Sequence, residues 1–166
     1  VTYPGGCEIG QRPINLHLFG LRQLGIKIDE SYGYLDCSVD ELRGADIHLD
    51  YPSVGATENI MLAACRAKGY TVIRNAAKEP EIVDLQNFIN SMGGNISGAG
   101  TNTIVIEGKD SYDETEYTVI PDRIVTGTYL LAAAITGSSI MVDNIVLDHI
   151  QSIIAKLRAS GCVIKP

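Results

Sequence analysis

Positive charge is scarce in this sequence: 13 Lys and Arg residues stand against 20 Asp and Glu residues, and the net charge is −7 at pH 7. This deficit argues against a general nucleic-acid or anionic-membrane surface, whereas a local cluster of cations still suffices to bind a small anion. The sequence also has no charged-then-apolar leader and no apolar run long enough to cross a bilayer. We therefore expect a soluble chain that binds neither nucleic acid nor a membrane.

The cysteine pairs typical of metal sites are absent as well. The four cysteines are scattered, no C-x-x-C pair occurs, and none of the three histidines lies near them in the sequence. Zinc sites need closely spaced ligands, so we expect no metal. Cys65 and Cys162 lie in apolar segments and are expected to be buried free thiols, which favours a reducing cytoplasm.

A glycine-rich loop near the start of the chain is the first feature that suggests chemistry. Cys7 lies among Gly5, Gly6 and Gly10, in a segment without hydrophobic periodicity, and Arg12 follows five residues later. Such a loop is exposed and able to carry function, and a nearby guanidinium favours the thiolate. Cys7 is therefore a candidate nucleophile or acid/base group, and the alternative is an ordinary loop cysteine.

A repeat of 68 residues organises the chain. Gly25, Gly93 and Gly161 each follow an apolar helical pattern and precede a short strand pattern, as expected for a glycine that ends a helix. One complete unit is predicted to contain two helices, at about 54–67 and 79–92. Its strands are expected at 46–50, 70–74, 95–97 and 103–107. The order is β-α-β-α-β-β, and the class is α/β or α+β.

The first helix of each full unit is rich in Ala, Leu, Ile and Met and nearly free of charge, so we expect it to be buried. The same repeat places the tail of one unit before the complete one. A third unit follows the complete one and stops after its fifth element, at 164–166. A chain that begins and stops within units is expected to be part of a longer protein.

Several motifs together resemble the UDP-N-acetylglucosamine enolpyruvyl transferases over essentially the whole chain. The motifs are Pro4-Gly5-Gly6-Cys7-Glu8-Ile9-Gly10, Arg12-Pro13-Ile14-Asn15-Leu16-His17, Ser53-Val54-Gly55-Ala56-Thr57-Glu58-Asn59-Ile60-Met61, Asn75-Ala76-Ala77-Lys78-Glu79-Pro80-Glu81-Ile82-Val83-Asp84-Leu85, Ile96-Ser97-Gly98-Ala99-Gly100-Thr101 and Val119-Ile120-Pro121-Asp122-Arg123-Ile124. The resemblance implies an inside-out α/β barrel made of two domains, each with three β-α-β-α-β-β units, which is incomplete here. By the same resemblance, residues 1–121 are most of the domain with the cysteine loop, and residues 122–166 begin a unit of the other domain.

The activity implied by the resemblance is transfer of the enolpyruvyl group of phosphoenolpyruvate to the 3-hydroxyl of UDP-N-acetylglucosamine, with release of phosphate. This reaction is the first committed step of peptidoglycan synthesis, and so supports cell wall biogenesis, cell shape and cell division. It takes place in the cytoplasm and needs no cofactor. In such enzymes the residue matching Cys7 donates a proton, forms an adduct with phosphoenolpyruvate and is alkylated by fosfomycin. Arg12 matches the arginine that binds phosphoenolpyruvate.

The resemblance also implies two segments that bind the sugar nucleotide. The stretch Arg12, Pro13, Ile14, Asn15, Leu16 and His17 matches the uracil and ribose side, and Ser53, Val54 and Gly55 match the turn that binds the diphosphate. Asn15 replaces the usual Asp, which keeps an acceptor but removes a charge. Val125 replaces an acidic residue, and Tyr51 occupies a position where some relatives have lysine. Ser53 also suits a helix N-cap, and His17 a packing role.

Three alternatives remain open from the sequence. The shikimate-pathway enolpyruvyl transferase shares the fold but lacks the Gly-Gly-Cys loop. A non-catalytic module that binds a UDP-sugar or a regulatory protein is compatible with Asn15, whereas an RNA-binding domain is disfavoured by the net charge. Because the general base of the family lies outside these 166 residues, we expect the chain alone to be inactive.

Overall fold

The computed structural model describes residues 1–2 and 13–165, which form two compact units. The first unit spans Val1–Tyr117 and the second spans Thr118–Pro166. This division lies four residues before the domain boundary expected at residue 121, and the assignment of the units to two domains stays a prediction.

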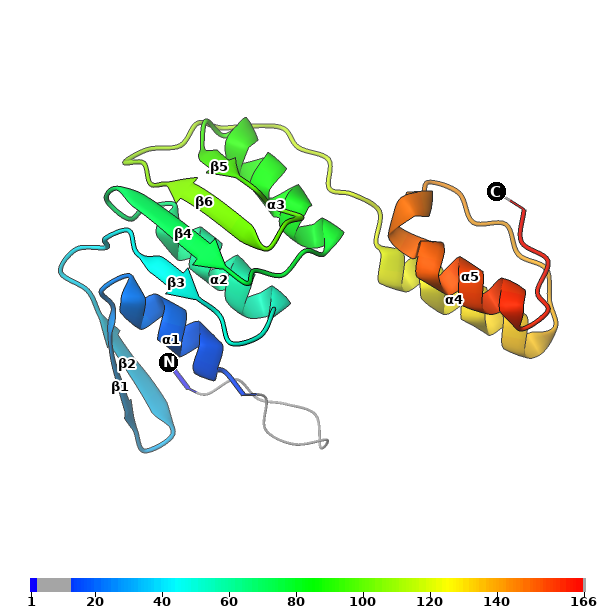
Figure 1. Ribbon diagram of the computed structural model, residues 1–166, viewed down its shortest axis with the longest axis horizontal. Coiled ribbons are helices and arrows are strands. Elements are labelled where there is room, and N and C mark those ends of the chain that lie inside the picture. The colour runs from blue at the N-terminus through cyan, green and yellow to red at the C-terminus, as the bar shows by residue number, and fades with distance from the viewer. Residues whose placement is uncertain (3–12, 166) are drawn as a thin grey trace. The chain divides into compact units, whose positions relative to one another are not determined.

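The first unit contains three helices and six strands among its described residues (Figure 1). They are α1 (Asn15–Gln23), β1 (Lys27–Ser31), β2 (Tyr34–Ser38), β3 (Asp46–His48), α2 (Val54–Ala64), β4 (Tyr70–Arg74), α3 (Pro80–Ser91), β5 (Asn95–Ser97) and β6 (Thr103–Glu107). β1 and β2 form an antiparallel hairpin, and the other strands form a sheet in the order β3-β4-β6-β5. The predicted β-α-β-α-β-β unit is confirmed, with β3 parallel to β4 and β6 antiparallel to both of its neighbours.

The four-stranded sheet buries one face against α2 and α3 and leaves the other face open. Alternate side chains point to opposite faces of a strand, and the buried set is almost entirely isoleucine. It comprises Ile47, Ile73, Ile96, Ile104 and Ile106. On α2 the matching residues are Ala56, Ile60, Met61 and Ala64, all fully buried. The prediction that this apolar helix lies in the core is therefore confirmed, and each large side chain contributes about 1.5–3 kcal/mol by burial.

Glycines end three helices as the repeat predicts. Gly25, Gly93 and Gly161 have φ values of 94°, 84° and 93°, a left-handed conformation that costs glycine little. Gly108 has a different role, because a Cβ there would lie 1.7 Å from the carbonyl oxygen of Ala67. The end of β6 can therefore approach the end of α2 only because residue 108 has no side chain.

The second unit contains α4 (Arg123–Thr136), a 3₁₀ helix η1 (Leu147–Ile150) and α5 (Gln151–Ala159). Shifted by the repeat length of 68 residues, the strands at 70–74 and 95–97 would recur at about 138–142 and 163–165, but the described residues of this unit form no strand. A strand needs a hydrogen-bonded neighbour, and neither segment has one here. Cys65 is buried as expected, whereas Cys162 is only half-buried, so the prediction for Cys162 is wrong.

Candidate substrate-binding site

Two of the segments expected to bind substrate lie side by side in the first unit. These are the start of α1, at residues 13–17, and the turn into α2, at residues 53–55. Cys7 and Arg12, expected to act on phosphoenolpyruvate, lie outside the described residues. The candidate site is therefore built from the two helix starts.

The turn into α2 leaves backbone donors available for an anion. Ser53 is the N-cap, and its hydroxyl accepts a bond of 3.4 Å from the N–H of Ala56. Its carbonyl accepts the N–H of Thr57 at 2.9 Å. The first N–H groups of a helix have no acceptor within it, so those of Val54 and Gly55 point out of the turn. Such a turn favours a phosphate group, and the capping role of Ser53 is compatible with it.

Thr57 fixes this turn from inside the core. It is fully buried, and its hydroxyl donates to the carbonyl of Ser53 at 2.8 Å and accepts from the N–H of Ala77 at 3.1 Å. One side chain thus connects the start of α2 to the segment that follows β4. The sequence did not predict this role, because the pattern around Thr57 is that of an apolar helix.

Asn75 joins the ends of the two parallel strands. Its amide donates to the carbonyl of Leu49 at 2.8 Å, and its φ of 56° turns the chain sharply out of β4. The N–H of Leu49 in turn donates to the carbonyl of Arg74 at 3.0 Å. Ligands commonly bind at the carboxyl ends of parallel strands, and these bonds hold that edge in place. Asn75 lay within a motif used for the resemblance but was not assigned a role.

His17 brings α1 and α2 together. Its Nδ1 lies 2.6 Å from the amide nitrogen of Asn59, and a Cβ on Gly55 would lie 3.2 Å from its Cε1. Burial lowers the pKa of His17, so the ring is neutral at physiological pH. Leu16, by contrast, belongs to the hydrophobic core, so only its backbone can contact a ligand. Pro13 and Asn15 are exposed beside it.

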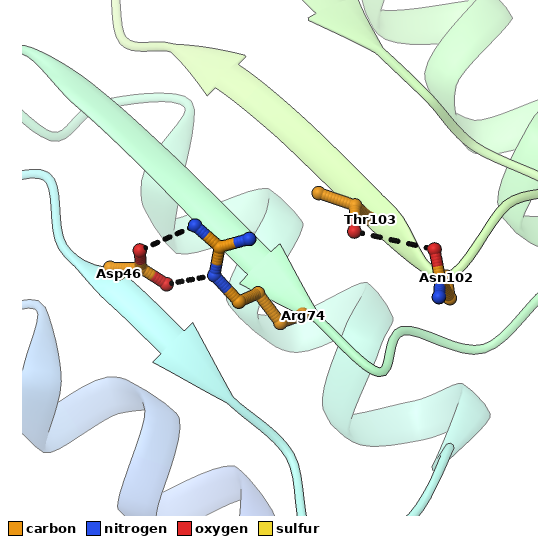
Figure 2. Close-up of polar contacts among 4 residues, drawn as sticks. All are labelled: Asp46, Arg74, Asn102 and Thr103. Atoms are coloured by element: carbon orange, nitrogen blue, oxygen red, sulfur yellow. Dashed lines mark hydrogen bonds and ion pairs between the residues drawn. The ribbon is translucent and has the colours of Figure 1, made fainter.

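The open face of the sheet carries an ion pair close to the same edge (Figure 2). Arg74 on β4 donates two bonds of 2.8 Å to Asp46 on β3, which holds the pKa of Asp46 below its usual range. Asn102 accepts the hydroxyl of Thr103 at 3.4 Å at the start of β6. The charge of Arg74 is thus already neutralised, so it adds no free cation for a phosphate.

A cavity of about 360 Å³ lies at the opposite end of α2, lined in part by Lys68, Lys109 and Asp110. Lys68 pairs with Glu41, and Lys109 donates to the carbonyl of Gly93, so both ammonium groups are already engaged. This cavity is therefore not the candidate site. In the part of the chain that the structure describes, no three metal-ligating side chains lie together, and no helix is long and apolar enough to cross a membrane.

The chain belongs to the EPSP synthase (3-phosphoshikimate 1-carboxyvinyltransferase) family, whose model matches residues 1–166. Several curated relatives of high identity are UDP-N-acetylglucosamine 1-carboxyvinyltransferases. Two of them come from Caldanaerobacter subterraneus subsp. tengcongensis. One is 62% identical over 99% of this chain and the other 56% identical over 97%. A relative from Halothermothrix orenii is 54% identical over 99% of the chain. The chain spans about 40% of the length of these relatives.

Solved structures support the enolpyruvyl transferase fold. The enolpyruvyl transferase NikO from Streptomyces tendae matches 75% of this chain and 32% of its own, with a TM-score of 0.66 and 24% identity. An EPSP synthase from Acinetobacter baumannii matches 79% of this chain and 30% of its own, with a TM-score of 0.60 and 23% identity. At this identity the match shows the fold alone. The predicted fold class is confirmed, and the described residues form no closed barrel.

Proposed function

We propose that the full-length protein carrying this sequence transfers the enolpyruvyl group of phosphoenolpyruvate to the 3-hydroxyl of UDP-N-acetylglucosamine. The observation that carries the proposal is the 62% identity over 99% of the chain to a UDP-N-acetylglucosamine 1-carboxyvinyltransferase. The juxtaposition of the two helix starts supports it, because both were expected to bind the sugar nucleotide. Roles in peptidoglycan synthesis, cell wall biogenesis and a cytoplasmic location follow from this proposal and stay predictions.

The sugar nucleotide binds at the start of the two helices. The N–H groups of Val54 and Gly55, at the positive end of α2, hold the diphosphate. The segment 12–17 holds the uracil and ribose, with the amide of Asn15 offering both a donor and an acceptor. His17 is the last residue of that segment, and its ring lies against Gly55 in the turn into α2, so it is placed beside the phosphate groups.

Cys7 and Arg12 act on phosphoenolpyruvate. Arg12 binds its anionic groups with the fork geometry that suits phosphate and carboxylate. The Cys7 thiol gives its proton to the methylene carbon, so positive charge develops on the neighbouring carbon. The sugar 3-hydroxyl attacks that carbon and loses its proton to a base outside these 166 residues. A proton then leaves the new methyl group and phosphate departs, which restores the double bond.

Phosphate release tests the proposal. The full-length protein is given phosphoenolpyruvate with and without UDP-N-acetylglucosamine, and compared with its Cys7→Ser variant. We expect turnover that needs the sugar nucleotide and falls by about a hundredfold or more in the variant, since general acid catalysis contributes on that scale. Cys37→Ser is the matched control, because Cys37 is exposed on β2 and should change nothing. Fosfomycin should inactivate the protein and its Cys37→Ser variant but not Cys7→Ser.

Two other results of this experiment would change the proposal. Turnover retained in Cys7→Ser would remove Cys7 from proton transfer and leave the reaction in place. A folded full-length protein that binds UDP-N-acetylglucosamine without turnover would overturn the proposal in favour of a non-catalytic sugar-nucleotide module.

A further inference from the structure

The contact between His17 and Asn59 determines where the histidine proton lies. Two nitrogen atoms only 2.6 Å apart can share one hydrogen, so one of them must donate and the other accept. The amide nitrogen of asparagine can only donate. With the amide nitrogen of Asn59 facing the ring, as in this structure, Nδ1 of His17 accepts and the proton of the neutral ring is on Nε2; the opposite orientation of the amide would put the proton on Nδ1, and the tautomer measurement below distinguishes the two.

The same contact directs Nε2 toward the first turn of α2. Asn59 and Gly55 are four residues apart and so share one face of the helix. His17 contacts both: its Nδ1 lies at Asn59, while its Cε1 and Nε2 would lie 3.2 and 3.5 Å from a Cβ on Gly55. The ring thus extends from Asn59 toward the start of the helix. Nε2 therefore lies beside Gly55, in the first turn of α2, whose N–H groups have no acceptor within the helix.

We infer that Asn59 is a positioning residue for the sugar-nucleotide site, because it holds His17 in the tautomer whose Nε2–H donates to the diphosphate. Asn59 itself does not contact the ligand. The inference rests on the proposed function, because the diphosphate is the group bound at this turn. Asn59 lies within the motif at residues 53–61, but neither the motif nor the family resemblance gave it a role.

The chemistry makes Asn59 difficult to replace. An aspartate would accept a hydrogen from Nδ1, so the proton would leave Nε2 and a lone pair would face the phosphate. Leucine would neither donate nor accept, so the tautomer and the ring orientation would no longer be fixed. Asn59 is exposed and contributes nothing to the core, so both variants should fold.

The test combines a spectroscopic signal with a binding measurement on the full-length protein, at about pH 8.5 so that the ring is neutral. Long-range proton–nitrogen spectra report the tautomer of His17, whose signals are assigned by their loss in His17→Gln. We expect the Nε2–H form in the native protein and the Nδ1–H form in Asn59→Asp. Affinity for UDP should fall about tenfold or more in Asn59→Asp, Asn59→Leu and His17→Gln. This is the loss expected when one hydrogen bond to a charged group is removed.

Asn102→Asp is the matched control. It makes the same chemical change at an exposed asparagine and keeps the acceptor for Thr103 (Figure 2), so tautomer and affinity should stay as in the native protein. An Nδ1–H form in the native protein, or unchanged UDP affinity in the Asn59 variants, would overturn the inference and leave the proposed function standing. A native protein that binds neither UDP nor UDP-N-acetylglucosamine would overturn the proposed function, and the inference with it.

Discussion

At the scale of single residues, Thr57 has the greatest influence on the geometry of the candidate site. Its hydroxyl is fully buried and makes two hydrogen bonds, to Ser53 and to Ala77. Ser53 begins the turn into α2, and Ala77 lies in the segment that follows β4. The position of the turn therefore depends on a bond made inside the core.

Replacing Thr57 by valine should lower the free energy of unfolding by about 1–3 kcal/mol. The shape is nearly unchanged, but the buried N–H of Ala77 loses its acceptor. Urea unfolding followed by circular dichroism measures the change. Thr57→Ser keeps the hydroxyl and loses one methyl group, so its loss should be smaller. A valine variant as stable as the native protein would show that the Ala77 bond contributes nothing.

At the scale of secondary-structure elements, α2 is fixed at both ends. Ser53 and Thr57 hold its start, and the segment after β6 covers its end. There Gly108 permits the close approach, the N–H of Lys109 donates to the carbonyl of Cys65 at 2.8 Å, and the hydroxyl of Tyr112 donates to the same carbonyl at 2.7 Å. The helix that presents the candidate site is therefore anchored on the far side of the unit.

The partly buried hydroxyl of Tyr112, which donates to the carbonyl of Cys65, makes the stability of the fold depend on pH. Burial, together with Cys65, raises the pKa of Tyr112 from 10.0 to about 12. The unfolded chain releases this proton near the lower value and the folded chain near the higher one. Stability contributed by Tyr112 is therefore present below pH 10 and lost as the pH rises toward 12.

Urea unfolding at about pH 9 and about pH 11 measures this loss. The native protein should lose more stability between these values than Tyr112→Phe, which cannot ionise. Tyr32→Phe is the control, because Tyr32 is 99% exposed and should follow the native protein. Equal pH dependence in the native protein and Tyr112→Phe would contradict the assignment.

At the scale of the whole molecule, the two units differ in how far their apolar helices are buried. α2 is covered by a sheet and by its neighbouring helices, whereas α4 leaves large apolar side chains exposed within the second unit, so the expected burial of the first helix of each unit holds for α2 and is wrong for α4. The exposed side chains are Ile124, Val125, Tyr129, Leu131 and Ile135, with exposed fractions from 50% to 88%. Exposed apolar side chains grouped on one helix favour association with another apolar surface.

The 166-residue chain should therefore bind a hydrophobic dye such as anilinonaphthalene sulfonate under native conditions. The double variant Leu131→Glu/Ile135→Glu should bind severalfold less dye and associate less, because charge interrupts the apolar face. Leu62→Glu on α2 is the control, a single exposed leucine in the other unit. If the double variant gave the same dye fluorescence as the native chain, the dye would be bound at a surface other than α4.

Much of the first unit could be predicted from local pattern. Strands at 70–74, 95–97 and 103–107 and the left-handed glycines after three helices follow from alternation and from glycine chemistry, and all were confirmed. Their counterparts one repeat later, at about 138–142 and 163–165, did not form among the described residues, although the repeat is present in the sequence. Local pattern gives the propensity for a strand, but the hydrogen-bonding partner comes from the rest of the sheet.

The sequence by itself determined the family, the repeat and the segments of the candidate site, because these are recorded in the order and spacing of residues. It also predicted Ser53 as a helix N-cap, which the structure confirms, and its role in binding stays a prediction. Only the tertiary structure decided that His17 meets Asn59 and Gly55, and that Thr57 ties α2 to Ala77. These pairs are 20 to 42 residues apart in the chain, and their contacts depend on how the helices pack, which no local pattern specifies.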